Sequence, residues 1–228
     1  MRRLRPAPSL APALALLILT ASVVPAWSSA RAAPPPVADR TIYVSADSAP
    51  GWLPSLEQEG SVRRSLEAYI AAVDGGRVTA AYAMLAPRRQ LIEGPRAFAA
   101  WIADFHAAAG PVIARRVLRL TWTKDAPTAP LPGVYAAFDM ANRFGRLDRH
   151  CSRIVLYQAP AGGDFQVARE EDTFLDNASA DAIAILHSPA DLDEAWRAMA
   201  AHCSNYDPEA LDRAAGPTPL AGGPPPGP

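Results

Sequence analysis

The chain has 228 residues, of which 50% are hydrophobic and 20% charged, with 22 basic and 23 acidic side chains. Four of the basic residues are arginines near the amino terminus, so the chain without its first 32 residues carries a net charge of about −5. This balance argues against nucleic acid or an anionic membrane surface as a partner.

The first 32 residues have the three parts of a cleavable secretory signal. Three arginines within the first five residues precede an apolar stretch over 10–24, which is too short to span a bilayer comfortably. Ala30-Arg31-Ala32 fits the small-x-small cleavage rule, so we expect the mature chain to begin at Ala33. The alternative is an uncleaved N-terminal anchor. We predict a periplasmic or secreted protein, and a single lysine among abundant Ala and Pro favours a bacterial source.

Composition divides the rest of the chain into four parts. Residues 33–60 are rich in Pro and Ser and predict a linker, with one extended piece over 41–44. Residues 61–176 predict a folded domain, and residues 177–206 predict a helical extension. Residues 207–228 are rich in Pro and Gly with almost nothing to bury, so we expect a disordered tail.

The first half of the central region predicts three helices, over 61–73, 78–85 and 95–109. Apolar residues recur there at three- and four-residue intervals. Ser61 is a candidate cap for the first helix, and Pro87 is expected to end the second. Pro95 suits the first turn of the third helix.

The second half predicts four strands, over 112–123, 134–144, 153–158 and 165–174. A Gly-Gly turn between the last two strands is typical of a hairpin. Three helices followed by a four-stranded meander predict an α+β fold, with the helices packed on one face of an antiparallel sheet. Two shorter helices, over 179–186 and 190–202, are expected to follow the sheet.

Several local patterns resemble a bacterial family that is often exported, domain of unknown function 4019. These patterns are Leu66–Gly76 followed by Tyr82, then Gly133–Phe138, Arg143-Phe144 and Gly162–Val167. The family usually has tryptophan where Phe165 stands, and the resemblance covers about residues 61–176. It implies a cone of the nuclear-transport-factor-2-like type, in which three helices are wrapped by a curved sheet. It carries no catalytic residue, and Cys151 and the C-terminal extension depart from it.

Cys151 and Cys203 are the only two cysteines of the chain. In an oxidising compartment such a pair predicts one disulfide, which would hold the C-terminal extension against the sheet. It would close a loop of 52 residues, worth about 4 kcal/mol by the chain-entropy estimate.

A metal site is the alternative interpretation of the same cysteines. His150-Cys151 and His202-Cys203 together supply two histidines and two cysteines, a known zinc ligand set. Neighbours on a strand point to opposite faces, and neighbours on a helix diverge by about 100°, so the four groups are not expected to converge. We therefore predict a disulfide and no metal.

The open end of a cone could hold a ligand, and isomerases and dehydratases of the superfamily that the resemblance implies work there. A carboxylate in such an apolar pocket acquires the raised pKa that a general base needs. Asp139 alternates with Phe138 and Met140, so we expect it to be an outer, solvated residue. The candidate pocket residues are Tyr69, Tyr82, Trp101, Asp104, His106 and Asp139.

Residues 169–172 form a charge run, Arg-Glu-Glu-Asp, within the last predicted strand. One interpretation is the polar end of a pocket or a surface that meets a partner. The other, which we favour, is a solvated strand end with cross-strand pairs to Arg143 or Arg153. Three arginines on or beside the first strand are expected to protect an edge from aggregation: Arg115, Arg116 and Arg119.

The sequence contains no P-loop, no G-x-G-x-x-G and no G-x-S-x-G motif, so it points to no cofactor and no covalent catalyst. The leading hypothesis is an exported, non-enzymatic module that binds a small apolar ligand or an envelope protein, and it could be a homodimer. The alternative is a small-molecule isomerase or dehydratase that uses acid–base residues of the cone pocket.

Overall fold

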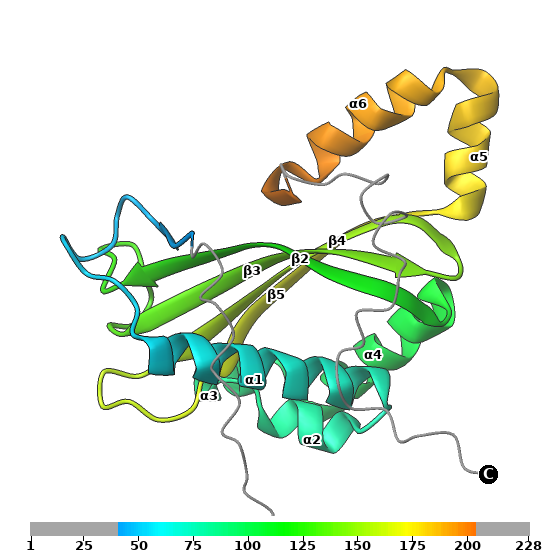
Figure 1. Cartoon of the computed structure of the whole chain (residues 1–228). Coiled ribbons are helices and arrows are strands. Elements are labelled where there is room, and N and C mark those ends of the chain that lie inside the picture. The colour runs from blue at the N-terminus through cyan, green and yellow to red at the C-terminus, as the bar shows by residue number, and fades with distance from the viewer. Residues whose placement is uncertain (1–40, 204–228) are drawn as a thin grey trace, which may run out of the picture. The chain divides into compact units, whose positions relative to one another are not determined.

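The computed structural model describes residues 41–203, apart from the side chain of His202. Four helices precede the long strands: α1 (Leu56–Asp74), α2 (Val78–Ala83), α3 (Pro87–Ile92) and α4 (Pro95–Ala109). The strands are β1 (Tyr43–Val44), β2 (Val112–Lys124), β3 (Val134–Phe144), β4 (Leu147–Gln158) and β5 (Gln166–Asp176). Helices α5 (Asn177–Leu186) and α6 (Pro189–Met199) follow, and a single 3₁₀ turn spans Ala201–Cys203 (Figure 1).

The predicted α+β class and antiparallel meander are confirmed. The sheet has the order β1-β2-β3-β4-β5, in which β1 pairs parallel with β2 and all the other pairs are antiparallel. Helices α1 to α4 lie on one face, as Figure 1 shows. This arrangement is consistent with a nuclear-transport-factor-2-like cone.

Helix α1 begins at Leu56, earlier than the sequence predicts, because Ser55 and not Ser61 caps it. The Ser55 hydroxyl accepts from the backbone N–H of Gln58 at 3.1 Å, and the Gln58 side chain accepts from the Ser55 N–H at 3.0 Å. This reciprocal capping box satisfies two amide groups that a helix start otherwise leaves unpaired.

Helix α3 was not predicted from the sequence. Pro87 does not simply end the preceding helix; it starts α3, where the missing N–H of proline costs nothing. The segment before it pairs with β5, because Val167 donates to Met84 and Ala86 donates to Val167, both at 2.9 Å. The α2–α3 connection therefore covers one end of the β5 edge.

A β-bulge at Ala168 decides which way the charged residues of β5 point. Leu156 pairs with Val167 while its neighbour Val155 pairs with Arg169, so Ala168 is the extra residue. Val167 is buried in the core, and simple alternation would turn Arg169 inward after it. The bulge resets the alternation, so that Glu170 faces the helices.

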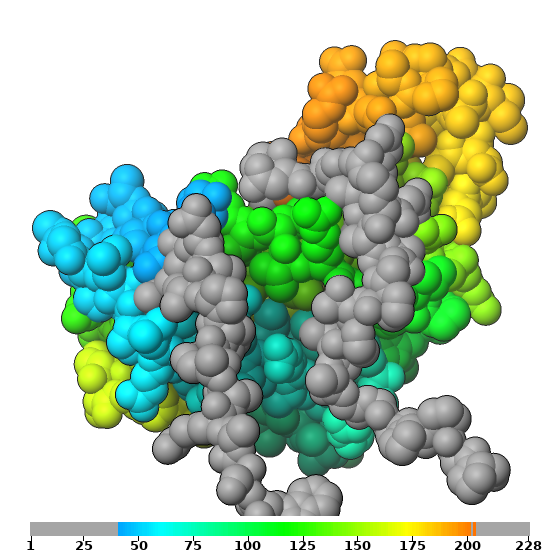
Figure 2. All heavy atoms as spheres, viewed as in Figure 1, coloured from blue at the N-terminus to red at the C-terminus, as the bar shows by residue number. Residues whose placement is uncertain are grey.

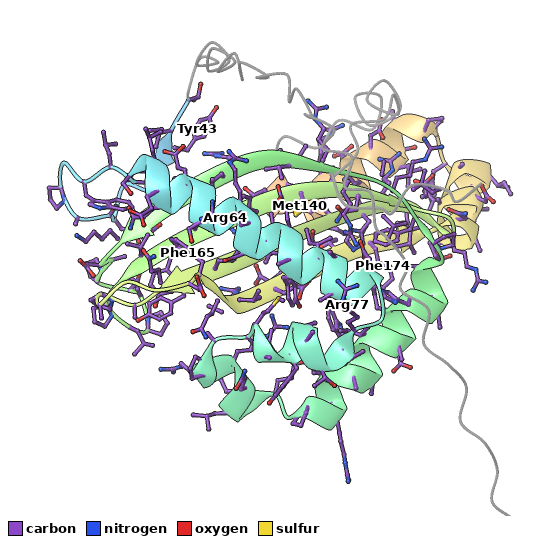
Figure 3. All side chains as sticks on the ribbon, turned by 60° about the horizontal axis from the view of Figure 1, so that its bottom comes forward. Tyr43, Arg64, Arg77, Met140, Phe165 and Phe174 are labelled. Carbon is purple, nitrogen blue, oxygen red and sulfur yellow. A yellow bond between two sulfur atoms is a disulfide. The ribbon has the colours of Figure 1, made fainter. Side chains whose placement is uncertain are left out.

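The core lies between the sheet and helices α1, α2 and α4. Figure 3 shows α1 crossing the sheet face on which Met140 lies, with Phe165 and Phe174 at opposite ends of β5. Large side chains fill this layer, and the fully buried ones include Tyr69, Phe98, Trp122, Phe138 and Leu156.

The C-terminal extension is attached to the opposite side of the sheet. Figure 2 shows α5 and α6 projecting from the body of the described unit. The predicted disulfide is present between Cys151 of β4 and Cys203, whose Cα atoms are 6.2 Å apart. Trp196 of α6 packs into the small buried cluster that surrounds this bond. Within residues 41–203, no helix is long and apolar enough to cross a membrane.

Candidate ligand-binding groove

A groove of about 920 Å³ runs around the free edge of β5. Its lining includes Arg169, which faces away from the helices, as well as Glu170 and Asp172, which face towards them. One wall is α3, and the opposite wall is the loop that follows β2, over 126–131. The volume lies in the range typical of small-molecule sites.

Aromatic rings form two parts of this groove. Tyr135 and Tyr157 lie side by side on the outer sheet face with ring centroids 5.0 Å apart, and their hydroxyls donate to backbone carbonyls of the 131–132 turn. At the inner end, Phe105 lies 6.2 Å from Trp101 and 6.1 Å from Phe174 by ring centroids. Phe174 is 45% exposed, so this inner cluster offers apolar surface to a ligand.

A buried acid stands behind the inner cluster. Glu170 has a side chain only 9% exposed, and it accepts a hydrogen bond of 2.6 Å from the hydroxyl of Tyr69 on α1. Arg89 of α3 approaches the same carboxylate at 3.6 Å, while its Nε bonds Glu93 at 3.1 Å. Three elements therefore converge on one carboxylate.

Burial raises the pKa of Glu170 from 4.5 to about 7, and the negative charge of Asp172 adds to this effect. The hydrogen bond from Tyr69 and the charge of Arg89 act in the opposite direction but do not cancel it. Burial and the neighbouring Glu170 also raise the pKa of Tyr69, which keeps the phenol protonated. Near neutral pH, Glu170 is thus present in both protonation states.

Asp172, two residues further along β5, faces a fully buried histidine. Nε2 of His150 lies 3.3 Å from Oδ1 of Asp172, outside hydrogen-bond geometry. Nδ1 of His150 is 3.0 Å from the amide nitrogen of Asn142. The second N–H of Asn142 bonds Ser152 at 3.0 Å.

The interior between the helices and the sheet is nearly filled. A cavity of about 30 Å³ remains there, bordered by Tyr69, Trp101, His150, Glu170 and Asp172. This volume accommodates about one water molecule and no organic substrate. The larger space is outside, in the groove, which shares Trp101, Glu170 and Asp172 with the cavity.

The structure places the six candidate pocket residues in different environments. Tyr69 and Trp101 border the inner cavity, and Trp101 also lines the groove. The Tyr82 hydroxyl lies 3.1 Å from the carbonyls of both Gln90 and Glu93, so it ties α2 to α3. Asp104 is exposed on α4, and His106 is half-buried next to Phe105.

Asp139 does lie on the outer face, but the expectation that it is solvated is wrong. Its side chain is 9% exposed and lies 3.5 Å from Nε of Arg153. Asp139 stands on a central strand between Arg119 and Arg153 in the sheet register, and these long side chains cover it.

The favoured interpretation of the charge run also needs correction. Arg153 does pair with Glu171 in the register, as a solvated strand end would. Glu170 and Asp172, however, point into the helix side because of the bulge at Ala168. Both acids border the groove and the inner cavity, which agrees with the alternative interpretation of the charge run as the polar end of a pocket.

The disulfide decides against the zinc arrangement for the two cysteines, because both sulfur atoms are bonded to each other. The side chain of His202, the fourth ligand of that arrangement, lies outside the described residues, as do the predicted signal over 1–32 and the tail over 207–228.

Fold and site together define an α+β domain with helices on one sheet face, a disulfide-linked helical extension and an aromatic groove at the sheet edge. Residues 65–169 match the family model described as "Protein of unknown function (DUF4019)", so this part of the chain is a DUF4019 family domain. Comparison with curated proteins and with solved structures returned no match.

Proposed function

We propose that this protein is an exported, non-enzymatic binding module that holds a small, largely apolar ligand in the groove around β5. The observation that carries the proposal is the groove itself, with its volume of about 920 Å³ and five aromatic side chains in its lining. The hydroxyls of Tyr135 and Tyr157 donate to backbone carbonyls, which fixes the orientation of both rings before a ligand binds.

The small size of the inner cavity and the positions of the ionisable side chains favour binding over catalysis. Tyr69 and His150 line the inner cavity of about 30 Å³, which has no room for an organic substrate. Of the groups that border this cavity, Glu170 and Asp172 are the two acids that also border the groove. An isomerase or dehydratase of the cone interior would need room that the packed core does not leave.

Export is supported by two independent features. The first 32 residues have the composition of a secretory signal. The only two cysteines form a disulfide, which persists in oxidising compartments and is rare in the cytoplasm. We therefore place the protein in the bacterial periplasm or outside the cell.

Titration with the neutral fluorescent probe 1-N-phenylnaphthylamine tests the proposal. We expect the probe to brighten and shift on binding to the mature protein. Ala137→Trp fills the floor of the groove and is expected to abolish this signal. Ala178→Trp, which adds the same side chain at an exposed position of α5, is the control and should bind normally. Equal binding by both variants would overturn the assignment of the groove.

A further inference from the structure

The inner end of the groove combines aromatic faces with acidic side chains. Trp101, Phe105 and Phe174 lie in one chain of ring contacts. Asp172 borders the groove and the inner cavity beside Phe105 and Phe174. Aromatic faces next to a carboxylate are the surroundings that an organic ammonium group prefers, because the negative face of a ring attracts a cation.

Most other charged side chains at the groove have a partner of opposite sign close by. The exceptions are Arg88 and Asp47, and Asp47 accepts hydrogen bonds from the hydroxyls of Ser45 and Thr128. Arg89 is paired with Glu93, Arg153 lies by Asp139, and Arg169 contacts Glu171. Asp172 is 15% exposed, and its Oδ1 lies 3.3 Å from Nε2 of His150 without forming a hydrogen bond. Among the described residues, Asp172 is therefore the carboxylate at the inner end of the groove that forms no ion pair with an arginine or lysine, whereas Glu170 has Arg89 at 3.6 Å.

The charges that surround this point favour a cation. The two arginines nearest to it, Arg89 and Arg115, already pair with other carboxylates, Arg89 with Glu93 at 3.1 Å and Arg115 with Asp74 at 2.6 Å. His150 of β4 is the remaining titratable group beside Asp172, and the hydroxyl of Tyr69 faces Glu170 from α1.

We infer that the inner end of the groove recognises the ammonium group of a small organic amine, with Asp172 as its counter-ion and Trp101, Phe105 and Phe174 as the surrounding aromatic wall. The apolar body of the amine extends over the sheet face towards Tyr135 and Tyr157. This inference rests on the proposed function and specifies the chemistry of its ligand.

A cation at this position also acts on Glu170. Its positive charge favours the ionised form and lowers the pKa of Glu170, which otherwise is about 7. Binding at neutral pH should therefore release protons from the protein to the buffer.

Three probes of similar shape and different charge test the inference by isothermal titration calorimetry on the mature protein. They are 2-phenylethylammonium, neutral 2-phenylethanol and anionic 3-phenylpropionate. We expect the cation to bind about tenfold more tightly than the alcohol, and the anion to bind most weakly. Titrations in buffers of different ionisation enthalpy should show proton release with the cation alone.

Asp172→Asn should remove the preference for the cation while 2-phenylethanol still binds, and this retained binding shows that the variant is folded. The matched control is Glu171→Gln, which changes the adjacent, outward-facing acid and should preserve the preference. Equal affinity for cation and alcohol, or tighter binding of the anion, would overturn the inference and leave the proposed function standing. Failure of all three probes to bind would overturn both.

Discussion

Glu170 links the chemistry of the groove to the stability of the fold. Its pKa is raised from 4.5 to about 7 by burial and by Asp172, so the fold favours the protonated carboxyl. The corresponding contribution to the free energy of unfolding is full below pH 4.5 and is lost as the pH rises to about 7. A shift of this size corresponds to about 3 kcal/mol.

Glu170→Gln should therefore flatten the pH dependence of stability, because glutamine stays neutral and still accepts from Tyr69. We expect the free energy of unfolding of the wild type to fall between about pH 5 and about pH 8, and that of the variant to fall by about 3 kcal/mol less. Urea denaturation at both pH values measures this difference. Glu171→Gln, on the outward face of the same strand, should behave as the wild type does; identical curves for all three proteins would contradict a raised pKa.

Among the individual elements, helix α1 shows which features of a helix the local sequence pattern predicts and which it does not. Its apolar spacing was readable from the sequence, and the helix ends at Asp74, one residue beyond the predicted range. Its start was not readable, because two serines are possible caps and the choice depends on Gln58, which completes the box with Ser55 alone. The bulge at Ala168 was equally hidden, since it is set by pairing with β4 and with Met84–Ala86, which are distant in the chain.

Substituting each serine in turn distinguishes the two caps. Ser55→Ala should lower the free energy of unfolding by about 1 kcal/mol, because it leaves an amide at the helix start unpaired. Ser61→Ala lies within the helix and should have a neutral or slightly stabilising effect, since alanine has the higher helix propensity. Chemical denaturation compares the two variants, and a larger loss for Ser61→Ala would show that the helix starts later.

The disulfide is expected to hold the C-terminal helices against the sheet. The double variant Cys151→Ala, Cys203→Ala removes the bond and should lower the free energy of unfolding by up to about 4 kcal/mol, because the loop of 52 residues is no longer closed in the unfolded chain. Hydrogen exchange should speed up in α5 and α6 while β3 and β4 stay protected. Uniform acceleration across the whole sheet would mean that the bond supports the core and not the extension.

For the molecule as a whole, the fold of the central domain was easier to predict from the sequence than the groove was. The α+β class, the meander and the cysteine pair follow from periodicity, turns and composition. The groove does not, because it depends on α3, on the loop over 126–131 and on a strand edge that three separate segments enclose. Asp139 and Glu170 were both expected to face solvent and are both buried, because neighbouring strands and a bulge decide their exposure.

The proposed export leads to a prediction about the mass of the purified protein. When the full-length gene is expressed in a bacterium with a functional secretion pathway, the intact mass of the purified protein should correspond to a chain that begins at Ala33. Iodoacetamide should add nothing before reduction and should modify both cysteines after it. A mass that retains the first 32 residues would support an N-terminal anchor, and two thiols that react without reductant would contradict the disulfide.

The most direct test of the binding groove is an amide chemical-shift titration of the ¹⁵N-labelled mature protein with 2-phenylethanol. We expect the largest shift changes on β5 between Ala168 and Phe174, on α3 and around Trp101, with little change in α5 and α6. Shifts that are confined to the helical extension, or no saturable shifts at all, would contradict this expectation.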